Sequence, residues 1–309
     1  MVKTGEKKNH RGVLEEIVRG ISGEILFDEP LNRHTSLRVG GPADVLAAPD
    51  SFADLRELVI RAGEAEVPVM VLGGTNLLVR DGGVRGIVIK LTGLQSIRTV
   101  GELELEAEGG VPMPKLARFA ARNGLTGMEF GLGIPGTVGG AVVMNAGVGE
   151  EMTSGVLSSV RVLTPDGSVR DLLRGEIDFG YRWSRLPRGI VVSARMNLRK
   201  GQKEKIQKTM QRFLDYRRDT QPLQSPSAGS VFKNPNGRFA AELIESLGLK
   251  GCRVGDAEVS KQHANFIINQ GEASARDILR LITMIGRKVE TETGVTLELE
   301  IKIVGSDRR

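Results

Sequence analysis

The 309-residue sequence predicts an α+β fold built in several layers. Between residues 43 and 91, short apolar runs flank one amphipathic helix, as in a βαβ-like unit. Between residues 97 and 198, several runs alternate at period two, which is typical of half-buried antiparallel strands. After Pro222 helices and strands mix again. A chain of this length can bury a large core and form two or three domains.

The first region begins with a charged segment, 1–20, which we expect to be a flexible basic N-terminus, and a short helix is expected around 13–21. The next elements are apolar runs expected as strands and an amphipathic run expected as a helix. The strands are 43–49, 67–73 and 86–91, and the helix is 52–65.

The second region contains antiparallel strands and two helices. Residues 97–111 alternate, and a helix over 113–124 is stopped by Gly124. Asp166-Gly167 lies between two alternating runs in 159–172, which is a strong hairpin signal. A strand over 189–198 and a charged helix over 204–219 complete this region.

The final region is predicted to alternate helices with strands. Helices are expected over 239–248 and 273–294, with Gly294 as the residue that ends the second one. A strand is expected over 265–269. Residues 295–305 alternate strictly and predict a last strand.

Composition excludes several classes of protein. No run approaches the roughly 18 apolar residues of a membrane helix, and the charged N-terminus lacks the apolar core of a secretory signal. A single cysteine, Cys252, excludes an intrachain disulfide. The net charge of +5 could attract nucleic acid, but the basic residues are scattered and aromatic residues make up only 4%. We expect a cytoplasmic protein that binds neither nucleic acid nor membrane.

Forty glycines suggest a backbone that approaches a ligand closely. Gly73, Gly74, Thr75 and Asn76 follow a buried strand and can form a nest of N–H donors for a phosphate. A second glycine-dense segment covers 129–147. Its GLGIPG run matches the dinucleotide fingerprint G-x-G-x-x-G, but no hydrophobic strand precedes it and no helix opens from it, so we reject that interpretation.

The stretch SPSAGSVFKNP (225–235) places Ser230 beside a glycine. Ser230 is not in a G-x-S-x-G motif, and no histidine in the sequence indicates a triad, which argues against a nucleophile. From this stretch alone, a turn serine and a proton donor both remain open.

Several motifs together resemble one enzyme family. LRVGGPAD (37–44), VLGGTNLLVRDGGVRGIVI (71–89) and GLGIPGTVGGAVVMNAG (131–147) resemble the flavin-binding half of the UDP-N-acetylenolpyruvoylglucosamine reductases. YRWS (181–184), SAGSVFKNP (227–235), VSKQHANFIIN (259–269) and LELEI (297–301) resemble their remaining signatures, in the expected order. The resemblance covers about residues 31 to 305.

The resemblance implies a two-subdomain FAD-binding module, like that of the vanillyl-alcohol oxidases, plus a C-terminal α+β substrate-binding domain. The subdomains would be 21–93, completed by 301–309, and 94–220, followed by a substrate domain over 221–300. It also implies non-covalent FAD, NADPH as reductant, and reduction of UDP-N-acetylglucosamine enolpyruvate to UDP-N-acetylmuramate for peptidoglycan. The partner would be this nucleotide sugar, with no obligate protein partner.

The family pattern also implies roles for single residues. Ser230 matches the proton donor, and Arg182 matches the arginine that stabilises the enol intermediate. Alternation places Glu298 and Glu300 on one strand face, and only the family pattern favours Glu300 as catalytic. Further residues fall into two groups: Gly73, Gly74, Thr75 and Asn76, with Gly133, Gly136, Thr137 and Gly140, for FAD, and Tyr181, Lys233 and Asn234 for substrate.

Two other points follow from the same motifs. His263 and Asn265 are expected to be structural or peripheral. Only 47 residues (183–229) separate Arg182 from Ser230, so the chain resembles the shorter class of the family, without an inserted tyrosine-bearing lid loop. Two alternatives are a different oxidoreductase on the same FAD module, such as a 2-hydroxy-acid or sugar oxidase, and a basic nucleotide-binding protein without catalysis.

Overall fold

The computed structural model describes the backbone of residues 3–308 and the side chains from residue 10 onward. The chain divides into two compact units. The first contains the residues up to Asp28 with Asp44–Leu72 and Gly86–Leu214, and the second contains Glu29–Ala43, Gly73–Arg85 and the residues from Asp215 onward. Over the described range, no helix is long and apolar enough to cross a membrane.

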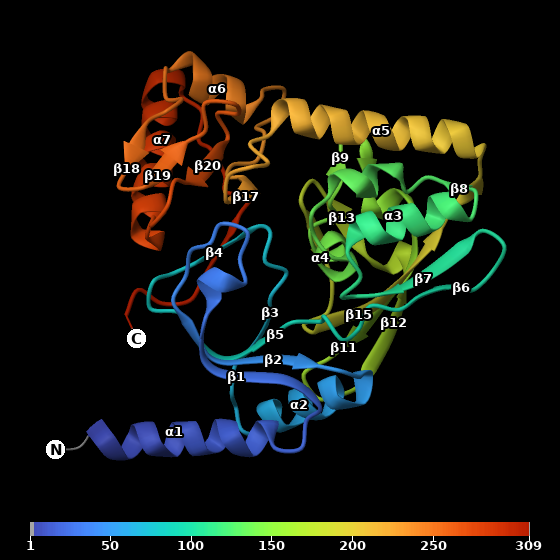
Figure 1. Cartoon of the computed structure of the whole chain (residues 1–309), viewed down its shortest axis with the longest axis vertical. Coiled ribbons are helices and arrows are strands. Elements are labelled where there is room, and N and C mark those ends of the chain that lie inside the picture. Colours follow the sequence, from blue (N-terminus) through green and yellow to red (C-terminus); the bar gives the residue numbers. More distant parts are fainter. Residues whose placement is uncertain (1–2, 309) are drawn as a thin grey trace. The chain divides into compact units, whose positions relative to one another are not determined.

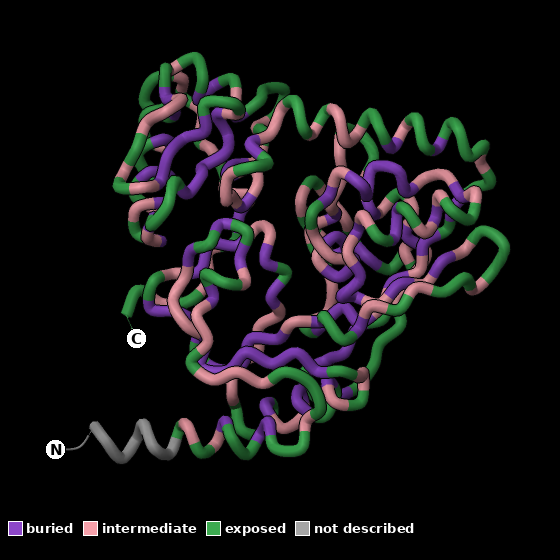
Figure 2. The backbone as a smooth tube through the Cα atoms, in the orientation of Figure 1, coloured by how far each residue is buried: buried purple, intermediate pink, exposed green. Residues whose placement is uncertain are grey.

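A four-stranded sheet in the order β1–β2–β5–β3 carries one layer of the first unit. Its strands are β1 (Gly23–Pro30), β2 (Pro42–Pro49), β3 (Val69–Val71) and β5 (Val84–Ile89), and β2 is buried along almost all its length (Figure 2). Helices α1 (Lys3–Val18) and α2 (Phe52–Glu64) lie on one face of this sheet (Figure 1) and share its apolar core. The predicted strands at 43–49, 67–73 and 86–91 and the helix at 52–65 are confirmed.

The N-terminal helix is longer than the sequence pattern predicts. Helix α1 begins at Lys3, whereas a short helix around 13–21 was expected. His10 lies in this helix, with its Nε2 atom 3.3 Å from Oδ2 of Asp44. Met1 and Val2 lie outside the described residues, and the flexibility of 1–20 stays a prediction.

The second layer of the first unit is an antiparallel sheet in the order β12–β11–β15–β7–β6. Its strands are β6 (Ile97–Thr99), β7 (Glu104–Glu108), β11 (Leu157–Leu163), β12 (Val169–Leu173) and β15 (Ile190–Asn197). The predicted hairpin is confirmed, because Leu163 pairs with Val169 and Gly167 adopts φ +78° in the turn. Helices α3 (Met113–Arg122) and α4 (Val138–Val143) pack against this sheet.

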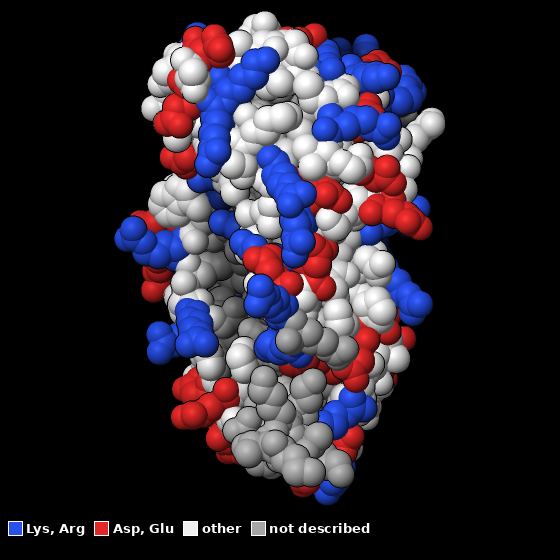
Figure 3. Space-filling model, turned by 90° about the vertical axis from the view of Figure 1, so that its left-hand side faces the viewer, with Lys and Arg blue, Asp and Glu red and all other residues white. Residues whose placement is uncertain are grey.

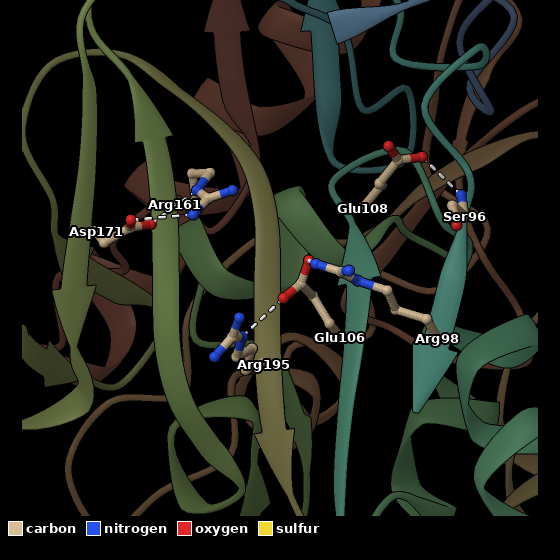
Figure 4. Close-up of polar contacts among 7 residues, drawn as sticks. All are labelled: Ser96, Arg98, Glu106, Glu108, Arg161, Asp171 and Arg195. Atoms are coloured by element: carbon tan, nitrogen blue, oxygen red, sulfur yellow. Dashed lines mark hydrogen bonds and ion pairs between the residues drawn. The ribbon is translucent and has the colours of Figure 1, made fainter. Parts of the chain in front are cut away.

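Cross-strand ion pairs cover the other face of this sheet. Glu106 accepts hydrogen bonds from Arg98 at 2.6 Å and from Arg195 at 2.7 Å, one from each neighbouring strand (Figure 4). Burial by itself would raise the pKa of the Glu106 carboxyl, but the two guanidinium groups outweigh it and leave that pKa below its usual range. Arg161 and Asp171 pair in the same way across β11 and β12.

Three small ribbons and the larger part of one long helix complete the first unit. The ribbons are β8 (Leu125–Thr126) with β16 (Arg199–Lys200), β9 (Gly147–Val148) with β10 (Glu151–Met152), and β13 (Asp178–Gly180) with β14 (Trp183–Arg185). Helix α5 (Lys203–Thr220) packs Ile206 and Met210 against Ala117 and Leu132. The helix predicted at 204–219 is therefore confirmed, and the limit of the first unit, Leu214, falls within it.

The second unit is centred on a sheet in the order β17–β20–β19–β18. Its strands are β17 (Ser227–Ser230), β18 (Arg253–Val254), β19 (Ala257–Val259) and β20 (Phe266–Asn269). Helices α6 (Ala240–Ser246) and α7 (Ala275–Thr293) share its core. As predicted, α7 ends at Gly294, which adopts φ +70°.

The continuous strand predicted over 295–305 is wrong. Only β21 (Lys302–Val304) is a strand, and it pairs in parallel with β4 (Leu77–Val79). Upstream, Leu299 makes an isolated bridge to Phe232, and the N–H groups of Glu300 and Ile301 both point at one carbonyl, that of Val231. The alternation of apolar and polar residues indicates which side chains are buried, but it does not indicate which segment pairs with them. Residues 298–300 bond to 231–233 and residues 302–304 pair with 77–79, so the stretch does not form one continuous strand.

The predicted division into 21–93, 94–220 and 221–300 remains a prediction. The second unit combines the predicted substrate domain with two segments of the first region, 29–43 and 73–85. The pairing of β21 with β4 joins Lys302–Val304 of the predicted C-terminal completion to Leu77–Val79 of that first region.

Candidate active site

Ser230 lies at the end of a bulged strand in the second unit. Ser227 pairs with Ile268 and Ser230 with Phe266, so two residues of β17 intervene where β20 has one. Gly229 lies within this bulge and adopts a left-handed backbone conformation with φ +77°. The bulge turns the end of the strand and leaves Ser230 half-buried.

Glu300 is brought close to Ser230 through the backbone. The Glu300 N–H donates to the carbonyl of Val231, the residue after the serine, at 2.8 Å. The Lys233 N–H donates to the carbonyl of Glu298 at 2.8 Å, so residues 231–233 and 298–300 run alongside each other. The structure therefore places two of the three predicted catalytic residues in one short stretch of backbone pairing.

The two glutamates that periodicity could not separate have different surroundings. The Glu298 side chain is 76% exposed, and its Oε2 atom accepts a bond from Nζ of Lys233 at 3.2 Å. Glu300 is half-buried. The two side chains therefore differ in exposure, and the catalytic role of Glu300 stays a prediction.

Two predicted substrate residues follow in the same loop. Lys233 makes an ion pair with Glu298, and Asn234 is exposed, with its side-chain oxygen accepting the N–H of Ala240 at 3.1 Å. Ala240 is the first residue of α6, so Asn234 helps to begin that helix. Their contacts with substrate remain predictions.

His263 and Asn265 both contact neighbouring residues of the second unit, and their expected structural or peripheral role stays a prediction. The His263 ring packs edge-on against Phe266 at 4.7 Å, and burial lowers the pKa of the His263 imidazole. The Asn265 side chain is buried and hydrogen-bonds with the backbone of Phe232.

Arg182 occupies the tip of a two-residue hairpin in the first unit. Gly180 pairs with Trp183, which leaves Tyr181 and Arg182 as the turn. Arg182 adopts φ +63°, a left-handed conformation that is uncommon for a residue other than glycine. Its guanidinium lies 5.0 Å from the centre of the Tyr181 ring and donates to the Gly147 carbonyl at 3.3 Å.

Asn145 supports this hairpin and was not identified from the sequence. Its side chain is buried, donates to the carbonyl of Gly180 at 3.0 Å and accepts the N–H of Ser154 at 3.0 Å. The only indication in the sequence was its position in the run MNAG (144–147), within the second glycine-dense segment.

The first glycine-rich loop has the properties of an anion nest. Among the described residues, no protein acceptor is found for the backbone N–H groups of 73–76, whereas the carbonyls of Gly74 and Asn76 accept bonds from Ser36 and Lys302. Gly74 is buried, adopts φ +78°, and would bring a Cβ atom to 2.8 Å from the His34 carbonyl. These N–H groups suit a phosphate.

Ser36 connects this loop with the serine strand and was missed by the sequence analysis. Its N–H donates to the Gly74 carbonyl at 2.8 Å, and its hydroxyl donates to the Ser227 carbonyl at 2.6 Å. Both contacts lie within the second unit.

The second glycine-dense segment is not a dinucleotide fingerprint. Residues Glu129–Gly133 form a short 3-10 helix in place of the strand that the fingerprint needs. The expectation that no helix follows the GLGIPG run is wrong, because the short helix α4 begins at Val138, and Thr137 caps it by accepting the Gly140 N–H at 3.4 Å. Gly133 and Gly136 are half-buried. This segment belongs to the first unit with Tyr181 and Arg182, so the predicted residues fall into two sets, one on each unit.

A basic groove on the second unit contains none of the predicted residues. It has a volume of about 910 Å³ and lies beside α7, with lining residues that include Arg80, Arg276, Arg280, Arg287 and Lys288. Figure 3 shows basic and acidic side chains interspersed over the face it displays. The candidate site rests on the residues described above, not on this groove.

Comparison with known proteins places the chain in a class. Residues 43–173 match the family described as "FAD binding domain", and residues 221–304 match "UDP-N-acetylenolpyruvoylglucosamine reductase, C-terminal domain". With its α+β fold, the chain is therefore an FAD-dependent oxidoreductase with a dedicated C-terminal domain.

Full-length relatives define the family. The chain is 48% identical to UDP-N-acetylenolpyruvoylglucosamine reductase 2 of Symbiobacterium thermophilum, over 94% of this chain and 96% of that protein. It is 45% identical to the Lactococcus lactis reductase, over 91% and 95%. The crystal structure of the Thermus caldophilus reductase matches with a TM-score of 0.79 and 42% identity, over 92% of this chain and all of that one. The chain belongs to the UDP-N-acetylenolpyruvoylglucosamine reductase family.

Proposed function

We propose that this chain catalyses the NADPH-dependent, FAD-mediated reduction of UDP-N-acetylglucosamine enolpyruvate to UDP-N-acetylmuramate, a step in making peptidoglycan precursors. The observation that carries the proposal is the backbone pairing that brings Glu300 beside Ser230. The N–H of Glu300 bonds to the carbonyl of the residue after Ser230, in a chain that matches a reductase of this family over 94% of its length.

The glycine-rich loop fits the cofactor. The N–H groups of residues 73–76 have no protein acceptor within the described chain, and glycine at position 74 allows φ +78° without a Cβ atom 2.8 Å from the His34 carbonyl. A pyrophosphate is the part of FAD that suits such a nest. Gly133, Gly136, Thr137 and Gly140 are the proposed second contributors. Bound FAD supplies hydride transfer, from NADPH to the terminal carbon of the enolpyruvyl group.

The chain's own residues are then proposed to stabilise the negative charge of the intermediate and to donate a proton to it. Hydride addition to the terminal carbon leaves negative charge on the adjacent carbon and its carboxylate. A guanidinium can bind a carboxylate through two hydrogen bonds, which is the role proposed for Arg182 with Glu300 as its catalytic partner. The Ser230 hydroxyl gives its proton to the adjacent carbon, which completes the D-lactyl ether. Tyr181, Lys233 and Asn234 are proposed to bind substrate.

The oxidase alternative loses support from the C-terminal match. Residues 221–304 match the C-terminal domain of the reductase, and this range contains Ser230 and Glu300. Residues 183–229 form β14, β15, β16, α5 and most of β17, and their longest stretch outside helix and strand is 221–226. This compact segment agrees with the shorter class of the family.

The proposed reaction needs only small molecules. Its substrate is a nucleotide sugar and its reductant is NADPH, so we place the protein in the cytoplasm. The proposal requires no nucleic acid, membrane or obligate protein partner.

The experiment follows the two half-reactions of the flavin separately under anaerobic conditions. For Ser230→Ala, we expect reduction of the flavin by NADPH at the wild-type rate, because no substrate proton is needed there. Reoxidation by UDP-N-acetylglucosamine enolpyruvate should be slower by about 10²- to 10⁴-fold, the usual contribution of a general acid. Stopped-flow absorbance of the flavin measures both rates.

Two results would count against the proposal. Wild-type flavin that NADPH reduces but this substrate never reoxidises would remove the substrate assignment. Reoxidation at the wild-type rate in Ser230→Ala would remove Ser230 from the mechanism. Ser225→Ala, a change in the same serine-rich stretch outside β17, serves as the control and should leave both rates unchanged.

A further inference from the structure

The segment that follows Ser230 is held on two sides. On one side, the carbonyl of Val231 accepts the N–H of Glu300 at 2.8 Å. On the other side, the Val231 N–H donates to the backbone carbonyl of Asn265 at 2.8 Å. Val231 and Phe232 are both buried, so the position of this backbone is determined by these partners.

The Asn265 side chain replaces a missing ladder partner. Its Oδ1 atom accepts the Phe232 N–H at 2.9 Å, and its Nδ2 atom donates to the Phe232 carbonyl at 2.7 Å. Asn265 is only 3% exposed, so water cannot readily substitute for either bond. The regular pairing of β17 with β20 ends at Ser230. Beyond it, the side-chain amide of Asn265 takes the role of a strand partner and bonds to both the N–H and the carbonyl of Phe232.

We propose that Asn265 is a positioning residue for the protonation step. It fixes residues 231–232, which start directly after Ser230 and whose Val231 carbonyl holds the backbone of Glu300. One buried amide therefore holds the backbone that directly follows Ser230 and that bonds to the backbone of Glu300. The inference rests on the proposed function, because only that reaction assigns a proton to Ser230.

The chemistry predicts a selective effect. A variant at Asn265 leaves a buried N–H, a buried carbonyl, or both without a partner, and the backbone shifts to relieve this. Misplacement of a catalytic group by about 1 Å can slow a reaction about 100-fold. Flavin reduction by NADPH needs neither Ser230 nor its proton, so it should be spared.

The test measures both half-reactions in the holoenzyme of two variants. Asn265→Ala loses both side-chain bonds, whereas Asn265→Asp keeps the shape and the acceptor and loses the donor. In each we expect flavin reduction within about twofold of wild type and reoxidation by UDP-N-acetylglucosamine enolpyruvate slowed at least about tenfold. The solvent deuterium isotope effect on reoxidation should increase, because proton delivery limits the rate more strongly.

Asn269→Ala is the matched control. Asn269 is a buried asparagine at the end of β20, the strand that begins directly after Asn265, but its side chain bonds to the carbonyl of Leu37 and to the N–H groups of Gly271 and Ala273. We expect it to lower stability without a selective loss of reoxidation or a larger isotope effect.

Several outcomes would overturn the inference. These are unchanged reoxidation in the Asn265 variants, equal slowing of both half-reactions, the same selective pattern in Asn269→Ala, or failure of both Asn265 variants to fold with flavin. If wild-type flavin were not reoxidised by the substrate, the proposed function itself would fail, which is a distinguishable result.

Discussion

Arg182 combines a proposed catalytic role with an unfavourable backbone conformation. Its φ of +63° is left-handed, and such a conformation disfavours an L-residue with a side chain by about 1–2 kcal/mol. Residues in such conformations gather at functional sites, where the surrounding structure holds them. Here the hairpin pairing of Gly180 with Trp183 and the Asn145 bond to Gly180 hold the turn.

This conformation leads to a prediction for Arg182→Gly. Glycine relieves the strain but adds freedom to the unfolded chain, so the free energy of unfolding should stay within about 1 kcal/mol of wild type. Loss of the guanidinium should slow flavin reoxidation by substrate about 10²- to 10³-fold. Denaturant unfolding and stopped-flow absorbance measure the two quantities.

Glu66→Gly is the control for the backbone effect. Glu66 also belongs to the first unit, is exposed and adopts φ +53°. Its glycine variant should keep wild-type reoxidation. A large loss of stability in Arg182→Gly would show instead that the arginine acts mainly in folding.

At the scale of elements, the bulge in β17 determines where Ser230 lies. Gly229 adopts φ +77°, and a Cβ atom placed on it would meet no atom within 4 Å. A substitution there is therefore opposed by backbone strain and not by a steric clash. The strand should respond by shifting the bulge, which moves Ser230.

We predict that Gly229→Ala lowers the free energy of unfolding by about 1–2 kcal/mol and also slows flavin reoxidation. Gly237→Ala is matched to it, because Gly237 adopts φ +71° and also has open space around its Cβ position. It should lose similar stability and keep the reoxidation rate. Equal reoxidation rates in the two variants would contradict a positional role for the bulge.

Most elements were predictable from the sequence because each depends on local periodicity and turn chemistry. The Asp166-Gly167 hairpin and the end of α7 at Gly294 are of this kind. The continuous strand over 295–305 failed because pairing partners are not encoded in alternation. Residues 298–300 pair with 231–233, whereas 302–304 pair with 77–79.

At the scale of the whole molecule, FAD should stabilise the folded protein. A ligand that binds only the native state, at about 100 times its dissociation constant, adds about 2.7 kcal/mol. We predict that FAD raises the thermal unfolding midpoint of the flavin-free protein by several degrees. Riboflavin, which lacks the pyrophosphate, should raise it much less at the same concentration.

Differential scanning fluorimetry with both compounds makes the comparison. An equal shift from riboflavin and FAD would contradict the pyrophosphate role proposed for the loop at 73–76. A shift from neither compound would contradict flavin binding altogether.

The sequence by itself determined the fold class, the family and the identity of the proposed catalytic residues, since motif types and their order are local properties of the chain. Tertiary structure decided the relationships between distant residues. It gave Glu298 an ion pair with Lys233, gave Arg182 its left-handed turn, and revealed the contacts of Ser36, Asn145 and Asn265. The physical reason is that hydrogen-bond partners far apart in the chain are chosen by how the backbone packs, and a period-two pattern is the same whichever partner a strand meets.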